Sequence, residues 1–127
     1  MRQAENDLAA GEMLQGTGFH AQACFMAQQA AEKALKALSY RRGSEATWGH
    51  QVSGTSGLLQ MVMTYYPSLG RYEEDAAILD QYYIATRYPD ALPDGAPYEV
   101  YSRTQAEEAI GRAGRIVREA RRIIKTN

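Results

Sequence analysis

The stretch ACFMAQQAAEKALKAL, residues 23–38, decides the fold. Its small apolar residues recur at helical spacing and share one wide face: Ala23, Ala27, Ala30, Ala31, Ala34, Leu35 and Leu38. The opposite face is polar, with Gln28, Gln29, Glu32, Lys36 and Ser39. Because alanine side chains let a neighbouring helix approach closely, we expect residues 19–42 to form the central helix, with bulkier side chains from its neighbours filling the space.

Helical periodicity continues on both sides of this stretch. The pattern predicts further helices over residues 3–15, 56–66, 70–88 and 103–125, with the glycines of GTG at 16–18 ending the first and Pro67 ending the third. The first helix carries Ala4, Leu8, Ala9 and Met13 as its apolar residues, and Ser102 with Gln105, or Thr104 with Glu107, offers a capping box for the last. The expected fold class is all-α: an up-and-down four-helix bundle with one short additional helix, formed by residues 1–127 as a single domain.

Composition limits the possible functions. The 14 Lys and Arg nearly cancel the 15 Asp and Glu, so the net charge of −1 points to neither nucleic acid nor membrane. The single cysteine, Cys24, excludes an internal disulfide and a multi-cysteine metal site, and two histidines form no histidine cluster. We expect Cys24 to be a buried small residue. Because no apolar run is long enough to span a bilayer and the start lacks a signal-peptide pattern, we expect a cytoplasmic protein without membrane contact. We also expect neither a metal nor a cofactor.

Cations crowd the C-terminal half of the last predicted helix. Arg112, Arg115, Arg118, Arg121, Arg122 and Lys125 face only Glu119 there. This arrangement suits the helix dipole. RNA contact is the alternative, but no aromatic residues are interleaved with these cations, as a single-strand binder would require. The sequence therefore favours the structural interpretation.

The segment RYPDALPDGAPY, residues 87–98, holds three of the four prolines and interrupts the helical pattern. Each proline removes a backbone donor and disfavours the α conformation of the preceding residue, so no helix continues through it. A second candidate segment is the glycine-bearing stretch before residue 56, where His50 follows Trp48 and Gly49. Its imidazole can serve as a general base or simply cap the next helix, and the structural role is favoured.

Two motifs, QQAAEKALKAL at 28–38 and TRYPD at 86–90, occur in this order with the His50 segment between them. Together they resemble the HEPN domain, a small helical bundle named for nucleotide binding in higher eukaryotes and prokaryotes. The resemblance covers nearly the whole chain. It implies a prokaryotic protein that forms a homodimer and is often encoded beside a minimal nucleotidyltransferase, with which it forms a toxin–antitoxin pair.

Many HEPN proteins are metal-independent ribonucleases that use an Arg followed, after four to six residues, by a His. Here the corresponding positions after Arg87 are Leu92, Pro93 and Asp94, so the general base is missing from the motif. The resemblance therefore implies a protein that binds a nucleotide or a partner nucleotidyltransferase without cleaving RNA. The alternatives are a toxin ribonuclease that pairs Arg87 with His50 as its base, and a structural subunit without a ligand.

The expected binding site surrounds Arg87. Its guanidinium would hold the anion, with Tyr88, Asp90 and Tyr98 shaping the pocket, while the i, i+4 pair of Glu32 and Lys36 would line the wall. The tyrosines near this segment also present more aromatic surface than so small a bundle can bury, which favours a homodimer.

Overall fold

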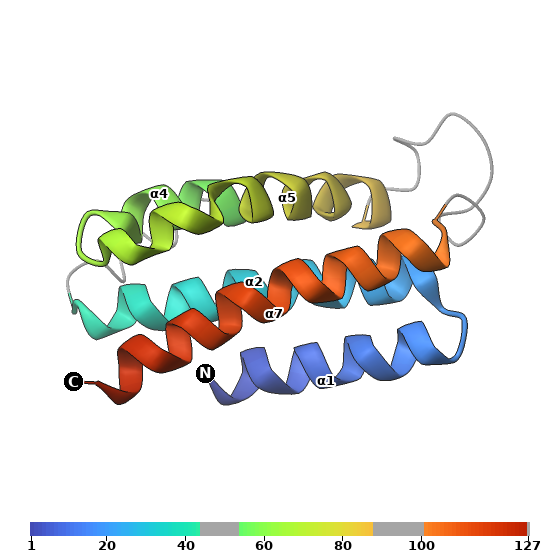
Figure 1. Cartoon of the computed structure of the whole chain (residues 1–127), viewed down its shortest axis with the longest axis horizontal. Helices are drawn as coiled ribbons and strands as arrows, with labels where there is room; N and C mark the ends of the chain where they lie inside the picture. Colours follow the sequence, from blue (N-terminus) through green and yellow to red (C-terminus); the bar gives the residue numbers. More distant parts are fainter. Residues whose placement is uncertain (44–53, 88–100, 127) are drawn as a thin grey trace.

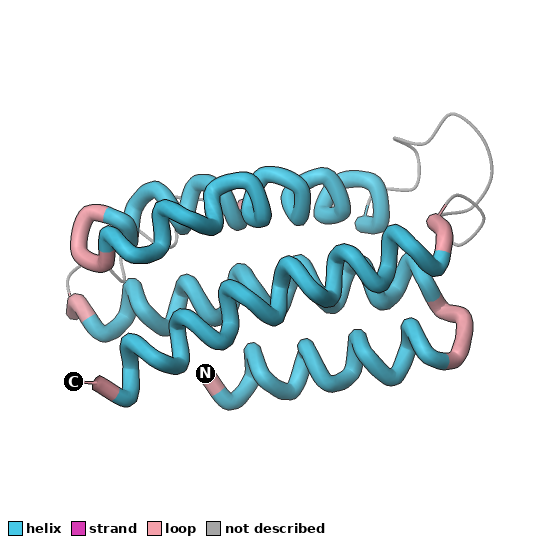
Figure 2. The backbone as a smooth tube through the Cα atoms, viewed as in Figure 1, coloured by secondary structure: helices cyan, strands magenta, loops and turns pink. Residues whose placement is uncertain are grey.

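The structure, a computed structural model, describes residues 1–43, 54–87 and 101–126, with the backbone alone for 83–87. Four long helices form the bundle: α1 (Arg2–Gly16), α2 (His20–Arg41), α5 (Glu73–Arg87) and α7 (Arg103–Lys125). The short α4 (Thr55–Met63) and a 3-10 helix, η1 (Pro67–Tyr72), lie between α2 and α5 in the chain. Short turns join α1 to α2 and α4 to η1, and no strand occurs in the described ranges (Figure 2), so the predicted all-α fold is confirmed.

The central position predicted for α2 is also confirmed. This helix packs against α1, α4, α5 and α7, and Figure 1 shows it inside the bundle with α7 in front of it. All seven residues of its predicted apolar face are buried. The bulky buried side chains come from α2 itself and from its neighbours: Leu35, Leu38, Leu58, Leu59, Leu69, Leu79, Ile116 and Val117. The bundle is therefore built around a helix surface made mostly of methyl groups.

The polar face predicted for α2 is wrong at two positions. Gln28 and Ser39, which the periodicity places on an outer face, are fully buried. The physical reason at Gln28 is that α4 covers this side of α2, and the Gln28 amide donates to the Thr55 hydroxyl at 3.2 Å. Where a neighbouring helix covers α2, the polar side chains on that side lose contact with solvent and must find partners within the protein.

The buried face of α1 also differs from the predicted one. Ala4 is buried as expected, but Ala9 and Met13 are exposed, and the face is completed by Asp7 and Gly11. A Cβ on Gly11 would lie 2.8 Å from Cδ1 of Ile110 and 3.3 Å from Cβ of Met26. The helix therefore approaches its neighbours through its smallest residue, and apolar content alone could not identify this face.

Helix ends agree with the sequence at some boundaries and differ at others. Gly18, with φ of +91°, follows the end of α1, and the Ser102–Gln105 capping box begins α7 as predicted. The predicted helix 56–66 instead ends at Met63, and Pro67 begins η1, where a proline nitrogen needs no hydrogen-bond partner. As a result, α5 begins at Glu73 and not at the predicted Gly70.

A buried carboxylate ties α5 to α7. Asp75 accepts from Arg112 Nη1 at 2.7 Å and from Arg115 Nη2 at 2.8 Å and Nε at 3.1 Å. Burial acts to raise the pKa of Asp75, but the hydrogen bonds and charges of Arg115 and Arg112 outweigh burial and hold the pKa below its usual value. Arg112 and Arg115 of α7 therefore serve to hold helices together.

A similar tie connects η1 to the C-terminal half of α7. Glu119 accepts from Arg122 Nη2 at 2.6 Å and from the Ser68 hydroxyl. The hydrogen bond from Arg122 is the main cause that lowers the pKa of Glu119 to about 2. On the other side of the bundle, Lys33 of α2 pairs with buried Asp7 of α1 at 2.6 Å. Carboxylates thus fix α5 and η1 to α7, and α1 to α2.

No described helix combines the length and the apolar character that a membrane span requires.

We predict that Ala31→Leu destabilises the protein by about 1–3 kcal/mol, because the fully buried methyl group of Ala31 leaves no room for three more carbons. Chemical denaturation measures the change. The matched control is Ala77→Leu at an exposed position of α5, where the same added volume meets solvent. Equal stability of the two variants would show that the alanine surface of α2 is not tightly packed.

The lowered pKa of Glu119 predicts how stability depends on pH. Because the folded-state pKa lies below the unfolded value of 4.5, the stabilisation is present above pH 4.5 and is lost as the pH falls toward about 2. We expect the difference in unfolding free energy between the native protein and Glu119→Gln to shrink over this range. Urea titrations of both proteins across this pH range measure it, and a constant difference would contradict the assigned ion pair.

Candidate functional site

The end of the bundle where α5 ends is the expected binding site. Arg87 is the last residue of α5, and its side chain is outside the described residues. His50, Tyr88, Asp90 and Tyr98 also lie outside the described residues. The structure thus fixes the position of Arg87 in the backbone and leaves the other proposed ligand contacts as predictions.

Two aromatic rings anchor this end of α5 to the start of α7. The rings of Tyr82 and Tyr101 pack edge to face, with centroids 5.8 Å apart and planes at 66°. Burial, and next the nearby Cys24, raise the pKa of Tyr82 to about 12. Burial likewise raises the pKa of the Cys24 thiol to about 12, so Cys24 is a protonated core residue, as the sequence predicts, and not a nucleophile.

A histidine that the sequence analysis did not select begins α2 at this same end of the bundle (Figure 1). The Nδ1 atom of His20 is buried and has no hydrogen-bond partner among the described residues. A buried ring nitrogen without a partner is uncommon. The sequence alone does not reveal that these residues lie at the same end of the bundle. His20 and Arg87 are far apart in the sequence, and they lie at one end only because α2 and α5 run in opposite directions.

Glu32 belongs to a polar network in the middle of the bundle. Its carboxylate accepts from Gln28 Nε2 at 2.7 Å and pairs with Lys36 Nζ at 3.2 Å, which confirms the predicted i, i+4 ion pair. The same Gln28 amide donates to the Thr55 hydroxyl at the start of α4. Gln28 accepts in turn from Gln29 Nε2 at 2.8 Å, so the buried amide bonds through both its nitrogen and its oxygen.

The network continues to α5 through the first turn of α4. Asp80 of α5 accepts from the backbone N–H groups of Thr55 at 2.5 Å and Ser56 at 3.0 Å, where α4 has no capping side chain of its own. Gly54, with φ of +85°, precedes this turn, and a Cβ there would lie 3.2 Å from Asp80 Oδ1. Asp80 therefore acts as the cap of α4 and fixes where the chain enters that helix after residue 53.

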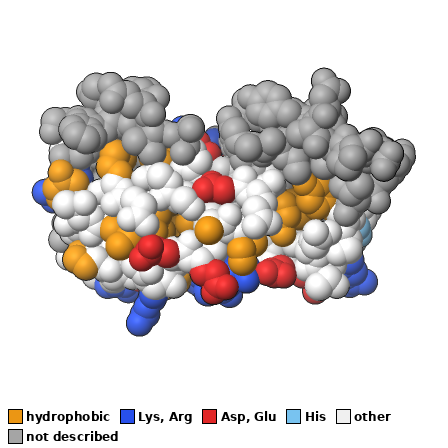
Figure 3. Space-filling view, turned by 90° about the horizontal axis from the view of Figure 1, so that it is seen from above, with side chains coloured by type: hydrophobic (Ala, Val, Ile, Leu, Met, Phe, Trp, Pro, Cys, Tyr) orange, Lys and Arg blue, Asp and Glu red, His pale blue; other side chains and the backbone are white. Residues whose placement is uncertain are grey.

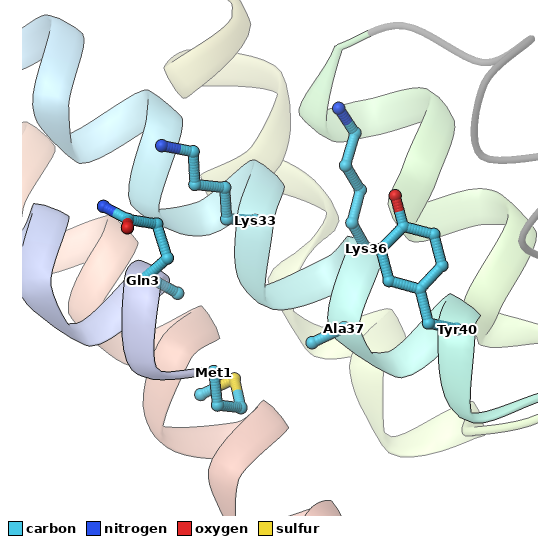
Figure 4. A pocket seen from close by; sticks show the side chains of 7 residues that line it. Met1, Gln3, Lys33, Lys36, Ala37 and Tyr40 are labelled. Carbon is cyan, nitrogen blue, oxygen red and sulfur yellow. The ribbon is translucent and has the colours of Figure 1, made fainter.

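The structure does not bring Lys36 beside the end of α5. Because α2 and α5 run in opposite directions, the C-terminal part of α2 lies toward the end of the bundle where α5 begins (Figure 1). Lys36 instead borders a hollow of about 330 Å³ between α1 and α2, together with Met1, Gln3, Ala4, Lys33, Ala37 and Tyr40. Figure 4 shows the Lys33 and Lys36 chains extending in a similar direction, away from Met1.

Both lysines of this hollow already have carboxylate partners, Asp7 for Lys33 and Glu32 for Lys36. The hollow is therefore a poor site for an anion. Within the described ranges, no group of three or more His, Cys, Asp or Glu side chains is placed to hold a metal ion.

Comparisons with known proteins support the helical fold described above. The model of the HEPN domain matches residues 1–123. Three crystal structures are similar over nearly the whole of both chains. The protein TT1696 from Thermus thermophilus is 38% identical with a TM-score of 0.74, and the match covers 95% of this chain and 92% of that one.

The other two structures are comparably similar. ST0689, described as an archaeal HEPN homologue, is 34% identical with a TM-score of 0.73 and coverage of 97% and 93%. A HEPN domain protein from Thermotoga maritima, TM0613, is 33% identical with a TM-score of 0.73 and coverage of 96% and 93%. A comparison with curated proteins found no match.

The capping of α4 by the Asp80 side chain leads to a testable prediction. Asp80→Ala removes the acceptor for two backbone N–H groups, and we expect it to lower the unfolding free energy by about 1–2 kcal/mol and to speed hydrogen exchange in the first turn of α4. Gln81→Ala, at an exposed neighbouring position of α5, is the control and should leave both quantities unchanged. Unchanged exchange at Thr55 and Ser56 in Asp80→Ala would show that the cap does not hold the helix.

Proposed function

Because the chain belongs to the HEPN domain family, we propose that it binds a nucleotide, or a partner minimal nucleotidyltransferase, at the end of the bundle where α5 ends. The position of Arg87 is the main observation that supports the proposal. It is the last residue of α5, at the end of the bundle where α2 begins. The planar guanidinium of arginine suits a phosphate group.

In this proposal Arg87 binds the anion, and Tyr88, Asp90 and Tyr98 complete the pocket. The two-pronged guanidinium matches the oxygens of a phosphate in bidentate fashion, whereas an ammonium acts as a point charge. Glu32 and Lys36 have an indirect role: their pair supports the network through Gln28 and Thr55 that sets the position of α4.

We further propose that the protein does not act as the Arg-and-His type of ribonuclease. Cleavage would require an imidazole to move the proton of the RNA 2′-hydroxyl beside the arginine that holds the phosphate. The positions that would supply it after Arg87 are Leu92, Pro93 and Asp94. The protein would then serve as the non-catalytic half of a toxin–antitoxin-like pair.

Exposed apolar side chains support a partner contact at this same end. Met13, near the end of α1, is 74% exposed, and Phe19, just before α2, is 52% exposed. Large apolar side chains exposed close together are typical of interfaces. We propose that they belong to the contact surface of a homodimer or of the partner nucleotidyltransferase.

The proposal predicts that Arg87→Lys keeps the charge but weakens nucleotide binding by about 1–3 kcal/mol, because the bidentate contact is lost, while the melting temperature barely changes. Titration calorimetry with ATP as the probe, together with a melting curve, measures both. Arg103→Lys is the matched control, since Arg103 is an exposed cation at the start of α7 that pairs with Glu107.

Two outcomes count against the anion site. The first is an Arg87→Lys protein that melts several degrees lower yet binds as before, which would make Arg87 a structural residue. The second is a native protein that does not bind ATP, which would remove the nucleotide and leave the protein partner as the proposed ligand.

A further inference from the structure

Two kinds of side-chain contact join α5 to α7, and they hold different parts of α5. Near the start of α5, the carboxylate of Asp75 bonds to Arg112 and Arg115. In the second half of α5, the ring of Tyr82 packs against that of Tyr101, just before α7. Because α5 and α7 run in opposite directions (Figure 1), the ring contact lies toward the end of α5 that carries Arg87.

The position of Tyr101 is fixed by the start of α7. Tyr101 directly precedes Ser102, the N-cap residue, whose backbone N–H donates to Gln105 Oε1 at 2.9 Å and whose hydroxyl accepts from the Gln105 N–H at 3.1 Å. The Tyr101 side chain packs against the buried core, which includes Ala106 in the first part of α7. A large apolar side chain just before the N-cap is in position to act as a hydrophobic staple, which sets the direction in which the chain enters a helix.

The ring pair lies inside the bundle. Tyr82 is only 6% exposed, and Tyr101 is partly buried. Burial, and next the nearby Cys24 of α2, raise the pKa of Tyr101. The pair therefore lies where α2, α5 and the start of α7 meet, and neither ring can move without leaving space in the core.

Arg87 follows this contact closely on α5. Five residues separate Tyr82 from Arg87, which is about 1.4 turns of helix. The backbone of α5 continues as helix through that interval. A change in the position of Tyr82 is therefore passed along the helix to the backbone of Arg87.

We propose that Tyr101 is a positioning residue for Arg87: through the ring of Tyr82, it fixes the last turns of α5 against α7. Bidentate binding of an anion by a guanidinium depends on precise placement, which neighbouring side chains supply by packing. Tyr101 would act through α5 and not by contact with the ligand. The inference rests on the proposed function for the ligand of Arg87, whereas the effect on α5 can be measured without a ligand.

The first test compares two substitutions by titration calorimetry with ATP. Tyr101→Phe keeps the ring and should keep the native affinity. Tyr101→Leu removes the ring contact and should weaken ATP binding about fivefold. Because Tyr101 is only partly buried, we expect the Leu variant to fold, and a melting curve checks this.

A double-mutant cycle shows whether Tyr101 acts through Arg87. In the Arg87→Lys protein, the bidentate contact is already lost, so adding Tyr101→Leu should weaken ATP binding by less than about twofold. A loss of about fivefold in both backgrounds would contradict the proposal, because the two residues would then act independently.

The matched control is Asp75→Asn, which weakens the contact between α5 and α7 near the start of α5. It should lower stability and leave ATP binding unchanged. Hydrogen exchange provides the measurement that needs no ligand. The backbone amides of residues 83–87 should exchange faster in Tyr101→Leu than in the native protein, and at the native rate in Tyr101→Phe and Asp75→Asn.

Native ATP affinity in Tyr101→Leu would overturn the proposal. Equal losses of affinity in Tyr101→Leu and Asp75→Asn would also overturn it, because binding would then follow overall stability. If the native protein does not bind ATP, the nucleotide site fails and hydrogen exchange decides the inference. Faster exchange at residues 83–87 in Tyr101→Leu alone would support the positioning role, and unchanged exchange there would overturn it.

Discussion

Close packing around the alanine surface of α2 is the constraint on which the other features depend. Side chains of this size bring neighbouring backbones near, and α2 consequently contacts α1, α4, α5 and α7. The same closeness explains why α1 presents Gly11 to Ile110 and Met26. Since α2 fills little of the interior itself, leucines of α4, η1 and α5 and the aliphatic residues of α7 complete the core.

A central helix that neighbours cover on several sides must satisfy the polar groups on those sides within the protein. Gln28 is fully buried and bonds to Glu32, Gln29 and Thr55, so its amide links α2 to the first residue of α4. Asp80 holds the backbone of that same turn from α5. The polar residues of the motif at 28–38 therefore have a structural consequence: they determine how α4 meets α5, and with it the point at which the segment containing His50 joins the bundle.

The sequence predicts features that depend on local spacing. The limits of α7, its capping box and the Glu32–Lys36 pair follow from residues close together in the chain. Features that depend on tertiary contacts were not predictable from one sequence. Asp75 between Arg112 and Arg115, the burial of Gln28, and the separation of Lys36 from the end of α5 all follow from which helices meet and in which direction they run. The pocket residues after Arg87 lie outside the described residues and stay predictions.

The direction of the helices also explains the positions of several cations. Both α2 and α7 end at the end of the bundle opposite to that of Arg87, so the negative ends of two helix dipoles favour positive charge there, and Arg41 and Lys125 lie in the last turns. The dipole acts only within the last turn, however, and Arg118 lies about two turns before the end of α7. No carboxylate of the described residues pairs with Arg118 either. Arg118 lies on the exposed face of α7, where hydration by solvent stabilises its charge without an ion pair.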